Sequence, residues 1–286
     1  MNIFESENKI IIENSDHFNL SDIFDCGQCF RFNRINNPDD TDGDDLNDFE
    51  GVAFGKYLRV TQKENTIYFE TNPEDFNNIW RNFFDIDRDY KKICGILEQD
   101  EILKKASEFC PGVRILKQHP FECLISFIIS QNNNIPRIKK IIERLCENFG
   151  EPVIHKAKTY YTFPSAEKIA NLTLDDLDVL KSGFRAKYIR DAAKKIAGGE
   201  IDLDSVYKMT LTDGSEYLQK IKGVGAKIAA CVLLFAYNKL ESFPIDVWIK
   251  KVLEKYYPAD FKPHEYFGQY AGIAQEYLYY YERKKK

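Results

Sequence analysis

Residues 221–232, IKGVGAKIAACV, place two glycines around a valine and then begin an apolar pattern with helical spacing. The stretch predicts a helix that ends near Ile221, a tight hairpin, and a second helix that begins at Ala226. We expect Gly223 and Gly225 to adopt positive φ and to leave backbone amides uncovered. Uncovered amides at a helix N-terminus bind anions, such as a phosphate of a nucleic-acid backbone. The alternative is an ordinary helical hairpin whose glycines serve only close packing.

A lysine and an aspartate lie near this hairpin in the sequence. Lys227 falls in the first turn of the second predicted helix, where the helix dipole disfavours a positive charge. The dipole and partial burial both lower the pKa of a lysine, and a neutral amine is a nucleophile. The alternative for Lys227 is a solvated surface lysine. Asp246, in FPIDVW, precedes another predicted helix and is either an N-cap or a carboxylate that faces the lysine.

The charge of the chain is distributed unevenly. The net charge of the 286 residues is −5, but residues 1–100 carry −12 and residues 181–286 carry +6. A basic C-terminal part is typical of proteins that bind a polyanion. Hydrophobic residues make up 44% of the chain, which is enough for one large domain or two of ordinary size.

The sequence shows no apolar run long enough for a membrane span and no signal-peptide pattern at its N-terminus. We therefore expect an intracellular soluble protein, in the cytoplasm or nucleoid, or in the nucleus of a eukaryote. Seven cysteines are scattered, and the close pair Cys26 and Cys29 lacks further ligands at zinc spacing. We expect these thiols to be reduced and structural.

The pattern along the chain changes from strands to helices. The segments KIIIEN, CFRFNRI, YLRVTQ and TIYFETN, all before residue 73, read as strands. The acidic segment 36–48 resembles a calcium-binding loop, but two of its key ligand positions would fall on Pro38 and Phe49, whose side chains cannot bind calcium. The segment is therefore predicted to be a solvated loop. Helical patterns follow from about Pro73, and the apolar spacing of residues 135–149 predicts a helix that stops at Gly150. Thr173 followed by Asp176 predicts a capping box. These features predict an α+β fold, with a small antiparallel sheet domain and flanking helices over residues 1–112 and an all-helical region over 113–286.

Six segments of the chain, in order, resemble one family. They are GQCFRF, GVRILKQHPFECLISFIISQNNNIPRI, GFRAKYI, KGVGAKIAACV, PIDVWI and YAGIAQEYL. Together they resemble the helix–hairpin–helix (HhH-GPD) DNA glycosylases, and within them the 8-oxoguanine DNA glycosylase/lyases, over nearly the whole chain. The resemblance implies a base-excision repair enzyme that acts on double-stranded DNA with oxidised guanine opposite cytosine, as a monomer. It places the hairpin motif at about residues 213–238.

The resemblance also implies roles for individual residues. Lys227 matches the amine that attacks the deoxyribose C1′ and forms a Schiff base, which permits strand cleavage by β-elimination. Asp246 matches the aspartate that assists base loss. For base recognition, Gly27 matches the glycine whose carbonyl accepts a hydrogen bond from the N7–H of 8-oxoguanine, a proton that guanine lacks. Gln275 matches the glutamine that reads the Watson–Crick edge of the flipped base. Cys231 and Tyr279 match residues that pack against the base.

Further matches concern DNA distortion and backbone contact. A flipped base costs a few kcal/mol of unstacking, which a residue filling the gap offsets. Asn132 matches that residue, and Phe184 matches an aromatic wedge. Arg137 and Arg185 match the arginines that hold the orphaned cytosine. The hairpin residues implied to contact DNA phosphate are Lys222, Gly223 and Gly225.

Some implied features depart from the family or involve no side chain. Trp248 stands where some members have a histidine that contacts phosphate, and Tyr279 where a phenylalanine often stacks on the base. The cysteines of the iron–sulfur branch are absent beyond Cys231, so we expect no cluster and no required cofactor. The resemblance implies a structural monovalent or divalent cation on main-chain carbonyls of Gln219, Ile221 and Val224.

Two other functions are compatible with a helix–hairpin–helix pattern. One is a monofunctional glycosylase for alkylated bases or adenine, which lacks a lysine at the position of Lys227. The other is a non-catalytic DNA-binding module, which needs neither the aspartate of PIDV nor Gln275. Because this chain has all three residues, the glycosylase/lyase hypothesis is preferred.

Overall fold

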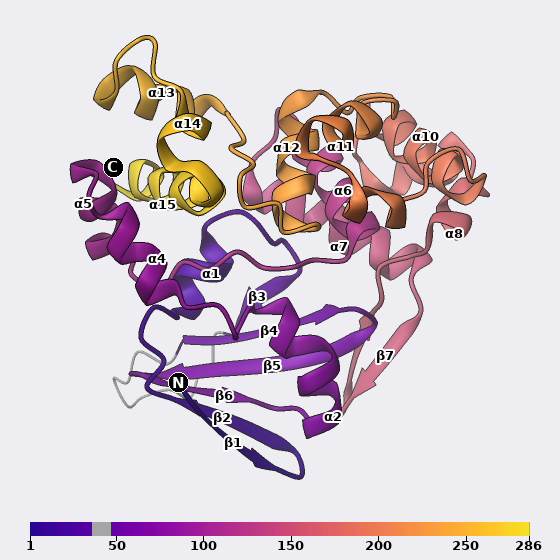
Figure 1. The fold of residues 1–286 in the computed structure, drawn as a ribbon. Helices are drawn as coiled ribbons and strands as arrows, with labels where there is room; N and C mark the ends of the chain where they lie inside the picture. The colour runs from indigo at the N-terminus through magenta and orange to yellow at the C-terminus, as the bar shows by residue number, and fades with distance from the viewer. Residues whose placement is uncertain (36–46, 286) are drawn as a thin grey trace. The chain divides into compact units, whose positions relative to one another are not determined.

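The computed structural model describes residues 1–35 and 47–285. Within these residues a six-stranded sheet has the order β1–β2–β6–β5–β4–β3, and the pairs β1–β2, β2–β6, β6–β5 and β4–β3 are antiparallel (Figure 1). The predicted α+β class, with a sheet followed by a helical region, is confirmed. Most of the loop predicted at 36–48 lies outside the described residues. The strands of the sheet are β1 (Asn2–Ser6), β2 (Lys9–Glu13), β3 (Phe32–Arg34), β4 (Asn47–Ala53), β5 (Lys56–Lys63) and β6 (Thr66–Phe69).

The chain divides into two compact units. The first comprises Met1–Gly51, Tyr57–Lys117 and Ile245–Lys286, and the second comprises Val52–Lys56 and Gln118–Pro244. The first unit therefore contains most of the N-terminal sheet together with the C-terminal helices. The predicted domain boundary between residues 112 and 113 stays a prediction.

Aromatic side chains form the core of the first unit. Phe24 stacks on Phe32 with ring centroids 4.6 Å apart, and Phe83 meets Phe84 edge to face at 5.0 Å. These rings bury large apolar areas between the sheet and the helices. The helices of this unit are α1 (Leu20–Asp25), α2 (Pro73–Asp75), η1 (Phe76–Trp80), α3 (Arg81–Phe83), α4 (Tyr90–Leu97), α5 (Glu101–Phe109), α13 (Val247–Tyr256), α14 (Pro263–Phe267), η4 (Gly268–Tyr270) and α15 (Ala271–Lys284).

The second unit is built mainly of helices. The predicted apolar face of residues 135–149 is buried in α7, which ends at Gly150 as expected. The predicted capping box at Thr173 is also present. A hairpin of β7 (Pro152–His155) and β8 (Lys158–Tyr161) was not predicted. The helices are α6 (Pro120–Ser130), α7 (Ile135–Phe149), α8 (Ala166–Ala170), α9 (Leu174–Leu177), η2 (Asp178–Leu180), α10 (Arg185–Ala197), η3 (Asp204–Lys208), α11 (Leu211–Leu218) and α12 (Ala226–Phe235).

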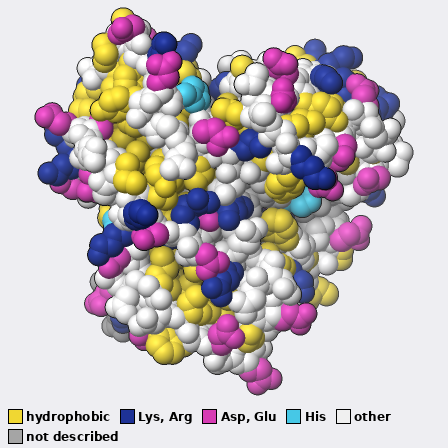
Figure 2. Space-filling view, viewed as in Figure 1, with side chains coloured by type: hydrophobic (Ala, Val, Ile, Leu, Met, Phe, Trp, Pro, Cys, Tyr) yellow, Lys and Arg dark blue, Asp and Glu magenta, His cyan; other side chains and the backbone are white. Residues whose placement is uncertain are grey.

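The surface shows no simple separation of charge on the face drawn in Figure 2, where basic and acidic side chains are interspersed. Binding of a polyanion therefore has to be argued from particular residues rather than from net charge. In the described part of the chain, no helix has both the length and the apolar character needed to cross a membrane.

Candidate active site

The hairpin between α11 and α12 depends on one glycine more than on the other. Gly223 has φ of +83°, and a Cβ at this position would lie 2.5 Å from the ring of Tyr188. Gly225 instead has φ of −98° and is the N-cap of α12, so the predicted positive φ is wrong there. The reason is that an N-cap residue adopts an extended backbone. The first helix also ends at Leu218, earlier than the predicted end near Ile221.

The N-terminus of α12 is open to solvent. Gly225 contributes no side-chain cap, and open space surrounds the position of its missing Cβ. Lys222 is held nearby, because its backbone N–H donates to Asp191 Oδ2 at 2.9 Å and its Nζ lies 3.6 Å from Oδ1. The arrangement offers the positive end of a helix and an exposed ammonium to an anion, as a phosphate site requires.

Lys227 is the second residue of α12, and its side chain is exposed. The partial burial that we predicted is therefore wrong, because this position of the first turn faces solvent. The Nζ atom lies 5.6 Å from the ring centroid of Phe127, which stacks on Phe235 at 5.5 Å. The amine thus lies over the stacked rings of Phe127 and Phe235 while it remains accessible to a substrate.

Asp246 caps α13 in the first unit. Its Oδ1 accepts the backbone N–H of Trp248 at 2.9 Å and of Ile249 at 2.8 Å. The N-cap prediction is therefore confirmed. Both of these bonds use one carboxylate oxygen, so Oδ2 can act on a substrate without loss of the cap. Trp248 is half-buried, and the ammonium of Lys251 lies 4.7 Å from its ring centroid.

The three asparagines between α6 and α7 have different positions. Asn134 caps α7 through the backbone N–H of Arg137, and Asn133 donates to the Ile129 carbonyl at the end of α6. Asn132 is exposed, with φ of +46°. Such a left-handed backbone is unusual outside glycine and marks a constrained turn. Asn134 is also exposed, but its side chain is used as the cap of α7, so Asn132 is the exposed asparagine of the three without a capping role.

The guanidinium of Arg185 supports this turn. Its Nε donates to the Gln131 carbonyl at 2.9 Å, and its Nη2 donates to the carbonyls of Gln131 and Asn132, the latter at 2.9 Å. Arg185 is buried, and this burial lowers its pKa. The positive charge of Arg137 lowers the pKa of Arg185 further, by a smaller amount. The arginine therefore fixes the backbone of Asn132, a contact across more than 50 residues that the sequence analysis did not predict.

The aromatic residue before Arg185 is exposed. Phe184 precedes α10, packs edge to face on Tyr188 at 5.9 Å, and has the Arg185 guanidinium 4.5 Å from its ring centroid. Arg137 is exposed on the first turn of α7. The second unit thus presents Asn132, the Phe184 ring and Arg137 to solvent, with Arg185 buried behind the turn, and these residue types suit the filling of a gap in stacked DNA.

The residues assigned to base recognition in the first unit lie around the loop after α1 and on α15. Gln275 is 4% exposed, and its Oε1 has no hydrogen-bond partner within the described residues. A buried amide oxygen without a partner favours a ligand that donates to it. Tyr279 follows one turn later, and Arg283 follows Tyr279 by another turn. The Nη1 of Arg283 donates to the Tyr279 hydroxyl at 3.3 Å and to the Cys26 carbonyl, next to Gly27, at 3.4 Å.

Cys231, the remaining residue assigned to base recognition, is buried on α12 in the second unit. Burial raises the pKa of the Tyr279 hydroxyl to about 12, so this side chain is a neutral phenol at ordinary pH. Arg283 and Gln28, the residue after Gly27, were not assigned a role from the sequence, although both adjoin residues that were.

The carbonyls proposed for a structural cation, those of Gln219, Ile221 and Val224, lie in the hairpin after the C-terminus of α11. The Ile221 carbonyl accepts the Val224 N–H at 3.1 Å and retains a second lone pair. Within the described residues no group of three or more His, Cys, Asp or Glu side chains could hold a metal ion.

Comparisons with known proteins identify the family of the chain. Residues 9–124 match the family "8-oxoguanine DNA glycosylase, N-terminal domain", and residues 125–268 match "HhH-GPD superfamily base excision DNA repair protein". The helical region thereby defines the class, a helix–hairpin–helix base-excision repair protein. The chain belongs to the 8-oxoguanine DNA glycosylase family of this superfamily, and it is an N-glycosylase/DNA lyase.

Individual relatives are similar over most of their length. A probable N-glycosylase/DNA lyase of Methanothermobacter thermautotrophicus is 32% identical over 230 residues, which are 70% of this chain and 73% of that protein. The 8-oxoguanine glycosylase/lyase of Clostridium acetobutylicum, solved with duplex DNA containing cytosine opposite 8-oxoguanine, is 39% identical with a TM-score of 0.92 and covers 100% of this chain and 98% of its own. Its apo-form has a TM-score of 0.90 at the same identity, with 98% and 99% of the chains covered.

Proposed function

We propose that this glycosylase/lyase flips 8-oxoguanine out of duplex DNA opposite cytosine and excises it through a Schiff base on Lys227. The observation that carries the proposal is an exposed lysine in the first turn of α12, directly after a glycine hairpin with open amides. The hairpin can hold a DNA phosphate while the amine reaches the adjacent sugar.

The chemistry follows from this placement. The neutral amine of Lys227 attacks C1′ as the bond to the base breaks, and the base leaves with the bonding electrons and a proton. Asp246 stabilises the positive charge that develops on the sugar, a contribution that is large for oxocarbenium-like centres. After the sugar ring opens, the amine and C1′ form an iminium. Loss of a proton from C2′ then expels the 3′ phosphate by β-elimination.

Recognition of the base is assigned mainly to residues of the first unit. The Gly27 carbonyl accepts the N7–H of 8-oxoguanine, and Gln275 reads the Watson–Crick edge with its buried amide. Tyr279 stacks on the base, as does a phenylalanine at this position in related proteins, and Cys231 of the second unit packs against it. The Tyr279 ring retains the stacking surface, so the change from phenylalanine is mild.

The second unit accounts for the DNA distortion. Asn132 fills the gap in the stack, Phe184 wedges the duplex, and Arg137 and Arg185 hold the orphaned cytosine. Lys222, Gly223 and Gly225 bind phosphate, and a cation on the carbonyls of Gln219, Ile221 and Val224 stabilises the hairpin. We propose that the protein acts as a monomer on double-stranded DNA and needs no iron–sulfur cluster.

Single-turnover excision tests the proposed substrate. We expect the fastest excision from a duplex with 8-oxoguanine opposite cytosine, slower excision opposite adenine, guanine or thymine, and none from an undamaged guanine–cytosine duplex. A duplex with 3-methyladenine is the test of the alternative, an alkylated-base glycosylase. Faster excision of 3-methyladenine than of 8-oxoguanine would overturn the proposal.

A further inference from the structure

The loop that contains Gly27 leaves one residue accessible between two buried neighbours. Gly27 is half-buried with φ of +93°, whereas Cys26 and Gln28 are each 0% exposed. Glycine has no side chain that could fix its peptide planes, and it is the residue with the widest conformational freedom. The direction of its carbonyl therefore depends on what holds the residues on either side.

Gln28 anchors the loop on the C-terminal side of Gly27. Its Nε2 donates to the Arg114 carbonyl at 2.7 Å and to the Ile23 carbonyl at 3.2 Å. Its Oε1 accepts the backbone N–H of Leu116 at 2.8 Å. The amide thus joins the last turn of α1 to the segment 114–116, and it does so with both donors and its acceptor engaged.

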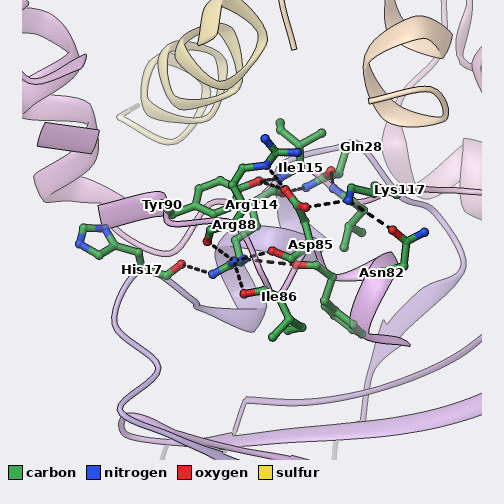
Figure 3. Close-up of polar contacts among 12 residues, drawn as sticks. His17, Gln28, Asn82, Asp85, Ile86, Arg88, Tyr90, Arg114, Ile115 and Lys117 are labelled. Atoms are coloured by element: carbon green, nitrogen blue, oxygen red, sulfur yellow. Dashed lines mark hydrogen bonds and ion pairs between the residues drawn. The ribbon is translucent and has the colours of Figure 1, made fainter. Parts of the chain in front are cut away.

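The segment that receives Gln28 is itself held firmly. The guanidinium of Arg114, which is 0% exposed, donates to the carbonyls of Asp85 at 2.7 Å, Phe84 at 3.2 Å and His17 at 3.2 Å. It also lies 4.2 Å from the ring centroid of Tyr90 (Figure 3). A buried cation with this many partners has a single arrangement, so the carbonyl that it presents to Gln28 is fixed.

The charge of this cluster is compensated in place. The Asp85 carboxylate is buried, pairs with Arg88 and lies 2.9 Å from the ammonium of Lys117. It also accepts the Tyr90 hydroxyl at 3.1 Å, and that hydroxyl accepts the Ile115 N–H at 2.9 Å. The network therefore reaches from Asp85 to the segment 114–116, and Figure 3 shows these side chains converging on that segment.

Arg283 anchors the loop on the other side of Gly27. Its Nη1 donates to the carbonyl of the Cys26–Gly27 peptide at 3.4 Å and to the Tyr279 hydroxyl at 3.3 Å. Tyr279, which stands where the family often has a phenylalanine, thus provides the hydroxyl that accepts the hydrogen bond from Arg283. One anchor joins the loop to the buried polar cluster, and the other joins it to α15.

We propose that Gln28, with Arg283 as a weaker second anchor, is a positioning residue for lesion recognition. It fixes the Gly27 peptide so that its carbonyl stands where an N7–H can donate to it. The inference rests on the proposed function of Gly27. Neither side chain has to touch the base, because their effect is on the direction of one backbone acceptor, and a misplaced acceptor loses the contact that separates 8-oxoguanine from guanine.

The test compares two buried glutamines in the same unit. Gln28→Met removes the amide and keeps the length of the side chain. Gln62→Met is the matched control, because Gln62 is also buried and holds the other end of α1, with its Oε1 accepting the Leu20 N–H at 2.8 Å and its Nε2 donating to the Phe18 carbonyl at 2.9 Å. Each variant is assayed in the full chain for 8-oxoguanine excision opposite cytosine and for strand cleavage at a pre-formed abasic site.

The ratio of these two rates separates positioning from general destabilisation. We expect Gln28→Met to lower excision roughly tenfold relative to abasic-site cleavage, and Gln62→Met to leave the ratio within about twofold of the wild type. Arg283→Met should lower the ratio about threefold. If Gln28→Met does not fold, Arg283→Met decides alone, since its side chain lies partly at the surface. An unchanged ratio in the folded variants overturns the proposal.

Gly27→Ala distinguishes the positioning role of Gln28 from the role of Gly27 in reading the lesion. A lowered ratio in Gly27→Ala with an unchanged ratio in Gln28→Met would overturn the positioning role and leave Gly27 as the lesion reader. An unchanged ratio in Gly27→Ala would overturn the role of Gly27 itself, and with it the inference. A wild-type enzyme that does not excise 8-oxoguanine would overturn the proposed function before either variant is compared.

Discussion

Asp246 has two roles that a single substitution can separate. Because asparagine is as good an N-cap as aspartate, Asp246→Asn should lower stability by only a few tenths of a kcal/mol. It should slow base removal by about 10²-fold or more, because the negative charge beside the sugar is lost. Single-turnover excision and thermal unfolding of the same preparation measure the two effects.

Asp100 provides the control for this prediction. It caps α5 in the same way, with its Oδ1 accepting the backbone N–H groups of Ile102 and Leu103, both at 2.9 Å. Asp100→Asn should leave excision at the wild-type rate. A large loss of stability in Asp246→Asn together with normal excision would show that Asp246 is only a cap.

For single residues, the sequence predicts local features such as a helix cap, but it predicts the burial and distant contacts of a side chain only in part. The cap at Asp246 follows from an acidic residue directly before a helical pattern, a local signal. The sequence offers the exposure of Lys227 only as an alternative, because it depends on which side of α12 packs on α6. The contact of Arg185 with the Gln131 and Asn132 carbonyls could not be predicted either, because it joins segments far apart in the sequence.

At the scale of the hairpin, the two glycines should tolerate substitution differently. Gly223→Ala forces a side chain into positive φ and against the Tyr188 ring, which should cost about 2 kcal/mol or more. Gly225→Ala meets open space and an ordinary backbone, so it should cost about 1 kcal/mol or less as a poorer N-cap. Thermal unfolding should show the larger fall in Tm for Gly223→Ala. Equal falls would contradict the role of the Tyr188 contact.

Elements with a buried face were predictable, whereas those without one were not. The apolar spacing of α7 identified the helix, and Gly150 identified its end. The β7–β8 hairpin has no such signal, since Ile154, its most apolar side chain, is 77% exposed. The strand order β1–β2–β6–β5–β4–β3 also lay beyond the sequence, because pairing is set by contacts between distant segments rather than by the pattern within each strand.

At the scale of the whole molecule, one carboxyl group should make stability depend on pH. Asp22 joins α1 to the segment before Arg114, with its Oδ2 accepting the Gly112 N–H at 3.0 Å. Burial raises the pKa of this carboxyl to about 6, and the Gly112 bond opposes the shift only in part. Because the folded chain then binds a proton more readily than the unfolded chain, this contribution to stability is present at low pH and is lost as pH rises through about 6.

Asp22→Asn isolates this contribution, because the amide oxygen can still accept the Gly112 N–H but carries no charge to desolvate. Its Tm should exceed that of the wild type at about pH 7.5, and the difference should shrink by about pH 5, where the wild-type carboxyl is protonated in the folded chain. Thermal unfolding of both proteins across this range measures the difference. A difference that stays constant between the two pH values would assign the pH dependence to other groups.

Borohydride trapping decides whether Lys227 is the nucleophile. Reduction of a Schiff base links enzyme and DNA covalently, so the wild type should give a cross-linked product on a duplex with 8-oxoguanine opposite cytosine. Lys220→Gln, a change at an exposed lysine of the same hairpin, should give the same product. Lys227→Gln, with its folding verified by its Tm, should give none. Undiminished trapping in Lys227→Gln would exclude Lys227 as the nucleophile.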